Sequence, residues 1–230
     1  MSEENRDMAG EAACKIYFSP VDVHQRLDRL ALRKENIDIA VRLGLLARRE
    51  CTENHPVTAK GFDQWSETVR ALRDQTGSSG WVPDNEANQG LIANPDLGAC
   101  IAVVPGDRNT GRKDAIPSTR SPRGVKTSDA VRGNNYFLFP EMEDEQIAAL
   151  SDIHRDFWLL MVYVNELAER IQYELSRPVK MSERKRPVKW SERILFSDFN
   201  YGDSIPVTER DDSSSPQRTP EIVVEVKRRA

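Results

Sequence analysis

The residues best suited to chemistry lie in a positively charged segment, residues 105–133. It holds seven Arg or Lys against three Asp, a net charge of +4, together with several Pro, Gly, Ser and Thr residues. Within it, residues 119–124 read TRSPRG. Arg can bind a phosphate through two parallel N–H bonds, hydroxyls donate to phosphate oxygens, and Gly permits close approach. The segment has few apolar side chains, so alone it predicts a mobile loop whose ligand is an anion.

A second basic segment spans residues 177–193, with seven Arg or Lys against two Glu, a net charge of +5. Since the whole chain carries −4, the remaining residues sum to −13. An acidic body with two basic segments attracts a polyanion locally, in a salt-sensitive way. The competing interpretation is that these charges are solvated and paired with neighbouring Asp and Glu. Trp190 either stacks on a base or packs inward at the start of a strand.

We therefore predict a non-enzymatic, nucleic-acid-associated binding or adaptor protein with no cofactor and no metal. DNA or RNA phosphates would contact ten side chains that are all basic: Arg108, Arg112, Lys113, Arg120, Arg123, Lys126, Arg184, Lys185, Arg186 and Lys189. The first alternative is a protein-protein interaction module that docks an acidic partner or a larger complex. The second is a metal-dependent nuclease or other hydrolase that uses Asp107, Asp114 or His154.

The motifs of known catalytic and metal sites are incomplete. Cys51 and His55 form one loose pair, whereas a structural zinc site needs four converging ligands. The stretch from Gly106 to Lys113 contains two Gly but ends Gly-Arg-Lys, so the phosphate-loop spacing fails. His154 has a carboxylate on either side within two residues, but no nucleophile turn accompanies it. The sequence therefore names no catalytic residue.

Composition predicts a cytoplasmic protein that does not contact membranes. The three cysteines are odd in number and widely spaced, which suits a reducing compartment. The N-terminus lacks the pattern of a signal peptide. The longest apolar run, residues 157–164, is far shorter than the roughly 20 residues of a membrane span.

Three helices are expected in the first third of the chain, over residues 20–31, 34–43 and 59–74. Ser19, Pro20 and Asp22 form a helix start, and Gly44 is expected to end the second helix. The third has a regular apolar stripe of Phe62, Trp65, Val69 and Leu72. A turn at Gly44 is also a partial helix-turn-helix signal, although the stretch after it is short for a recognition helix.

After residue 78 the apolar period changes from 3.6 to 2, which predicts strands. Residues 91–93 and 99–104 flank a Pro-Asp turn, and residues 157–164 and 171–175 predict a hairpin, with one long helix over 145–176 as the alternative. Further candidate strands are 136–139, 192–196 and 222–226.

The predicted fold class is α+β, with an N-terminal three-helix unit followed by a mostly antiparallel sheet of four to six strands with long basic loops. The predicted divisions are a disordered N-terminus at 1–15, a helical subdomain at 16–78, and a sheet domain at 79–230 that carries the basic loop 105–133 and a flexible loop 201–219.

Overall fold

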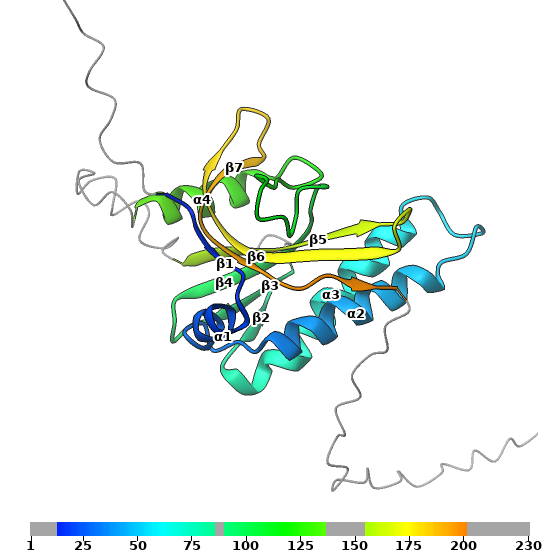
Figure 1. Ribbon diagram of the computed structural model, residues 1–230, viewed down its shortest axis with the longest axis horizontal. Coiled ribbons are helices and arrows are strands. Elements are labelled where there is room, and N and C mark those ends of the chain that lie inside the picture. The colour runs from blue at the N-terminus through cyan, green and yellow to red at the C-terminus, as the bar shows by residue number, and fades with distance from the viewer. Residues whose placement is uncertain (1–12, 86–89, 137–154, 202–230) are drawn as a thin grey trace, which may run out of the picture.

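A computed structural model describes residues 13–85, 90–136 and 155–201 of the chain. The described part has four α-helices and one mixed sheet of eight strands, so the expected α+β class is confirmed. The prediction of four to six strands is wrong in number. Among the described residues the pairing is mostly antiparallel, as expected, but two of the seven strand pairs are parallel. Three helices cover one face of the sheet and the fourth covers the other (Figure 1).

The expected N-terminal helices are α1 (Pro20–Asp28), α2 (Lys34–Glu50) and α3 (Ala59–Thr76). Ser19 caps α1 as expected, because its hydroxyl accepts a hydrogen bond of 3.2 Å from the backbone N–H of Asp22. α2 and α3 pack against each other along their length (Figure 1). The two helices therefore form the main cover on this side of the sheet.

Gly44 does not end α2, which continues for six more residues to Glu50. A Cβ at this position would lie 1.9 Å from Oγ1 of Thr68 and 2.7 Å from the backbone oxygen of Gln64, both on α3. Gly44 is therefore required by the close approach of two helices, and the local signal of a helix end is overridden. The helix-turn-helix interpretation is wrong for the same reason, since α2 makes no turn at Gly44.

The strands lie in the order β1-β7-β6-β5-β4-β3-β2, and β8 pairs with β6. The pairs β1–β7 and β4–β5 are parallel and the others antiparallel. The strand bounds are β1 Lys15–Tyr17, β2 Val82–Asp84, β3 Leu91–Asn94, β4 Ala99–Pro105, β5 Asp156–Asn165, β6 Arg170–Met181, β7 Pro187–Leu195 and β8 Phe199–Asn200.

Both predicted hairpins, β3–β4 and β5–β6, are present, and the single helix over 145–176 is excluded where the structure describes these residues. The parallel pairing of β4 with β5 was not expected, because about fifty residues separate these strands. That crossover contains α4 (Val125–Tyr136), in a segment predicted to be loop. Strands β1, β2 and β8 were also missed; each has only two or three residues, too few for a periodic signal.

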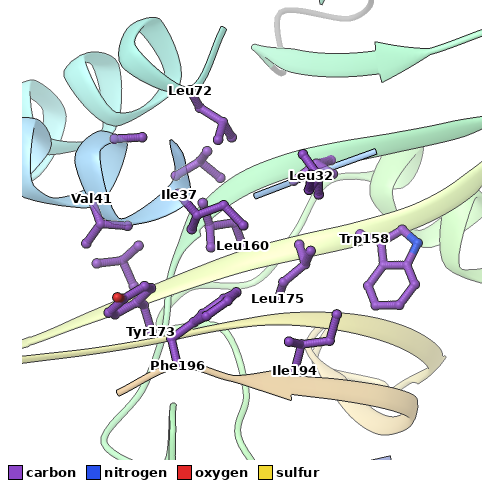
Figure 2. Close-up of a cluster of buried hydrophobic side chains, with 14 of the residues drawn as sticks. Leu32, Ile37, Val41, Leu72, Trp158, Leu160, Tyr173, Leu175, Ile194 and Phe196 are labelled. Atoms are coloured by element: carbon purple, nitrogen blue, oxygen red, sulfur yellow. The ribbon is translucent and has the colours of Figure 1, made fainter. Parts of the chain in front are cut away.

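The core has two parts, one on each face of the sheet. Ala99, Ile101 and Val103 of β4 face the α1–α3 side, while their neighbours along the strand face α4. Figure 2 shows side chains of α2 and α3 meeting those of β5, β6 and β7, with Leu160, Tyr173 and Ile194 among them. Burial on both faces explains why β4 and β5 appear in the sequence as continuous apolar runs.

Several sequence predictions fall outside the described residues: His154, the strand at 222–226, nearly all of the flexible loop 201–219, and the strand at 136–139 beyond Tyr136, which ends α4. Helices α1–α3 and the sheet share one apolar cluster, and the proposed boundary near residue 78 stays a prediction. Among the described residues, no helix is both long enough and apolar enough to span a membrane.

Candidate nucleic-acid interface

The first basic segment leaves β4 and follows a defined path that a buried ion pair holds in place. Arg193 of β7 and Glu174 of β6 are both almost fully buried, and Nη2 of Arg193 lies 2.7 Å from Oε2 of Glu174. Arg193 also donates to the backbone oxygens of Ala115, at 2.8 Å, and Arg112, at 2.9 Å. Glu174 accepts a hydrogen bond of 2.7 Å from the backbone N–H of Gly111. The loop predicted to be mobile is therefore attached to the sheet through groups supplied by β6 and β7.

The two basic segments are in direct contact, although 43 residues separate them in the chain. The backbone N–H of Arg123 donates to the oxygen of Lys185 at 2.8 Å, and the hydroxyl of Ser118 donates to the oxygen of Pro187 at 2.8 Å. Figure 1 shows the loop after β4 beside the tip of the β6–β7 hairpin. Trp190 is 3% exposed and donates to the oxygen of Pro117, so it packs inward and does not offer its ring to a base.

The ten predicted contact residues divide into three groups. Arg112 pairs with Asp114 at 2.9 Å, and the Lys113 ammonium lies 3.6 Å from the centre of the Phe18 ring. Lys126 is exposed on α4, and Lys189 is half-buried on β7. The other six form no ion pair with any residue that the structure describes: Arg108, Arg120, Arg123, Arg184, Lys185 and Arg186.

Not all of the positive charge counted in the second segment is exposed. Arg177 is buried, forms an ion pair with Asp156, and donates to the oxygen of Asn134 at 3.3 Å. Arg193 is used in the pair with Glu174. Two of the seven cations in this segment therefore stabilise the fold, and the remaining positive charge is concentrated at the hairpin tip.

A cleft of about 1030 Å³ opens beside the first basic segment. Its floor is the carboxyl-terminal ends of the parallel strands β4 and β5, where ligand sites of α/β sheets commonly lie. One wall is the first half of α3. Four cations and two carboxylates line it: Arg48, Lys60, Arg108, Arg120, Asp107 and Glu166. The formal charge of this lining is +2.

The electrostatics of the cleft favour an anion. The hydrogen bond and charge of Arg48 lower the pKa of Glu166, and the charges of Lys60 and Arg120 lower it further. Glu166 is therefore ionised at neutral pH and offsets one of the four cations. Asp107 accepts a hydrogen bond of 3.0 Å from the backbone N–H of Asn109. Since Arg108 and Arg120 lack an ion-pair partner among the described residues, they remain available to a ligand.

Aromatic side chains line the same cleft. Phe62 is 60% exposed, and its ring centre lies 5.8 Å from that of Trp65 with the planes tilted by 49°. The indole N–H of Trp65 donates to the oxygen of Val103 at 3.1 Å, which fixes the half-buried ring against β4. Sequence reasoning assigned both residues to an apolar packing stripe, and it missed Arg48 and Lys60. No local pattern identifies these four, because they meet only where α2, α3 and the sheet come together.

The candidate metal and catalytic residues have other partners. The thiol of Cys51 lies 3.1 Å from a carboxylate oxygen of Asp63, whose hydrogen bond raises the pKa of the thiol. Nδ1 of His55 accepts from the backbone N–H of Thr52 at 3.0 Å. In the parts of the chain that the structure describes, no three His, Cys, Asp or Glu residues are grouped as metal ligands.

Comparison of the chain with known proteins yields no match among family models, curated proteins or solved structures.

Proposed function

We propose that this protein is a non-enzymatic nucleic-acid-binding or adaptor protein whose phosphate contacts run from the cleft to the tip of the β6–β7 hairpin. The observation that carries the proposal is the meeting of two basic segments, through the hydrogen bond from Arg123 to Lys185. Arg120 lines the cleft and Arg123 touches the hairpin, so at most about 10 Å of chain separates the two regions. We call this continuous area the basic surface. It comprises Arg48, Lys60, Arg108, Arg120, Arg123, Arg184, Lys185 and Arg186.

The basic surface has the composition expected of a phosphate-binding site. Most of its cations are Arg, which can bind phosphate through two N–H groups at once. Their attraction for a polyanion depends on salt, because every phosphate neutralised by the protein releases bound counterions. If six phosphates contact the basic surface, the logarithm of the association constant should fall linearly with the logarithm of salt concentration. The expected slope is roughly −4 for a single strand and roughly −5 for a duplex.

The test is fluorescence anisotropy of labelled single-stranded and duplex oligonucleotides, repeated at several salt concentrations. The double variant Arg108→Gln/Arg120→Gln should weaken binding about tenfold or more, since each lost contact is a hydrogen bond to a charged group. It should also reduce the size of the salt slope by about 1 to 2.

The matched control removes the same charge elsewhere. Arg29 and Arg33 are exposed and do not line the cleft. The variant Arg29→Gln/Arg33→Gln should bind as the wild type does. The proposal fails if the wild-type protein binds neither oligonucleotide, if its affinity does not change with salt, or if the two double variants are equally weakened.

An acidic protein partner, or a larger complex, is the competing interpretation, because carboxylates would engage the same cations. Co-purification distinguishes the two: a partner that survives nuclease treatment supports docking to protein, and loss of the complex with nuclease supports nucleic acid. We include a cytoplasmic location in the proposal. It is supported by the three cysteines, all of which are free thiols.

A further inference from the structure

We infer that the cleft accepts an unpaired base against Phe62, so that the ligand of the basic surface is a single strand. This inference rests on the proposed function and adds the class of nucleic acid to it. Phe62 is a large apolar side chain that stays 60% exposed in a cleft lined by four cations. Neighbouring cations and aromatic faces are the two components of sites that hold single strands, in which phosphates contact Lys or Arg while bases stack on the rings.

The aromatic pair is held in place before any ligand arrives. Trp65 is fixed by its hydrogen bond to Val103 and by the packing of its ring edge close to Gly90. Phe62 rests against Trp65 from one turn earlier on α3. A base that stacks on Phe62 therefore meets a ring that already contacts the fixed Trp65, which lowers the ordering cost of binding.

The position of the cations relative to the rings suits a nucleotide chain. Lys60 precedes Phe62 by two residues on α3, and Arg108 and Arg120 reach the cleft from the loop after β4. The cleft volume of about 1030 Å³ is at the upper end of the roughly 300–1,000 Å³ typical of small-molecule sites, which suits a short segment of a polymer.

Neither a duplex nor an acidic peptide uses all of these groups. The bases of a duplex are paired and stacked inside it, so they cannot reach Phe62 without leaving the helix. The carboxylates of an acidic peptide can contact the cations, but Asp and Glu have no flat ring to place on an aromatic face. The combination of Phe62 and Trp65 with the cations therefore favours an unpaired strand.

Tryptophan fluorescence provides a direct readout, because Trp65 is the one tryptophan that lines the cleft. All four tryptophans are described, and Trp81, Trp158 and Trp190 are at most 3% exposed. The full chain is titrated with oligo-dT, with a duplex of equal length and with polyglutamate. Oligo-dT should bind more tightly than the duplex and quench the fluorescence. The variant Trp65→Phe should lose the quenching while binding persists in the anisotropy assay.

The energetic test is Phe62→Ala, which should weaken oligo-dT binding about five- to 150-fold and leave the salt slope unchanged, since stacking removes no counterion. Phe62→Trp should retain tight binding. Phe18→Ala is the matched control: Phe18 is also an exposed phenylalanine, at 54%, but it does not line the cleft. It should bind oligo-dT within about twofold of the wild type. Thermal melts should show that Phe62→Ala remains folded, as expected for an exposed side chain.

The outcomes separate the two proposals. If duplex and oligo-dT bind equally and Phe62→Ala changes neither, the single-strand inference is wrong and the proposed function stands. If neither nucleic acid binds, both are wrong. If polyglutamate alone binds and changes the fluorescence of Trp65, the occupant of the cleft is an acidic protein segment.

Discussion

The substitution Gly44→Ala should destabilise the protein, although alanine is the better helix former. Gly44 lies inside α2 with ordinary helical backbone, so local propensity favours alanine by about 0.8–1 kcal/mol. The new methyl group would lie 1.9 Å from Oγ1 of Thr68 and 2.7 Å from the backbone oxygen of Gln64. Rotation of the Thr68 side chain can relieve the first contact. The second involves the backbone of α3, so the two helices must move apart.

The free-energy cost of this steric clash exceeds the gain from the higher helix propensity of alanine. Overpacking a close-packed interior typically costs about 1–3 kcal/mol, and a contact with rigid backbone lies at the upper end of that range or beyond it. After the gain in helix propensity is subtracted, we expect a net loss of about 2 kcal/mol in the free energy of unfolding. For a chain of this length, that loss corresponds to a fall in Tm of about 4–8 °C.

Urea and thermal denaturation, followed by circular dichroism and tryptophan fluorescence, measure the effect. Gly61→Ala is the control, because Gly61 lies in α3 with no atom within 4 Å of a Cβ placed there. It should be neutral or stabilise by up to about 1 kcal/mol. In the double variant Gly44→Ala/Thr68→Ala, the loss should be smaller than the sum of the two single losses. If Gly44→Ala and Gly61→Ala stabilise alike, the close approach of α2 to α3 is refuted.

Three further predictions concern buried and half-buried polar groups. Asn134→Ala should cost about 3 kcal/mol in urea denaturation, because the amide makes three hydrogen bonds to β5 and β6; a loss under about 1 kcal/mol would contradict this. Arg193→Met leaves Glu174 buried without its partner, so trypsin should cut the loop after β4 faster than in the wild type, and equal rates would exclude the anchoring role. Burial alone would raise the pKa of Glu192, but Arg26 lowers it overall; stability should therefore decline as pH falls below about 4.5, and Glu192→Gln should flatten that decline in pH-dependent melts.

The first three helices and the two hairpins were predictable because their signals are local. The spacing of Val69 and Leu72, the cap at Ser19 and the turn between β3 and β4 depend on residues within a few positions of one another. Such patterns report which face of an element is buried. They do not report what covers it.

The tertiary structure decided the remaining features, each of which depends on contacts between distant residues. Local sequence marks Gly44 as a helix end, but a neighbouring helix determines its role. Counting charges cannot separate Arg193, which is buried against Glu174, from Arg120, which lines the cleft. The packing of α2 and α3 on each other and on the sheet brings Phe62 beside cations from both helices and from the loop after β4. Sequence patterns do not reveal these contacts, because the packing of side chains that are far apart in the chain determines them.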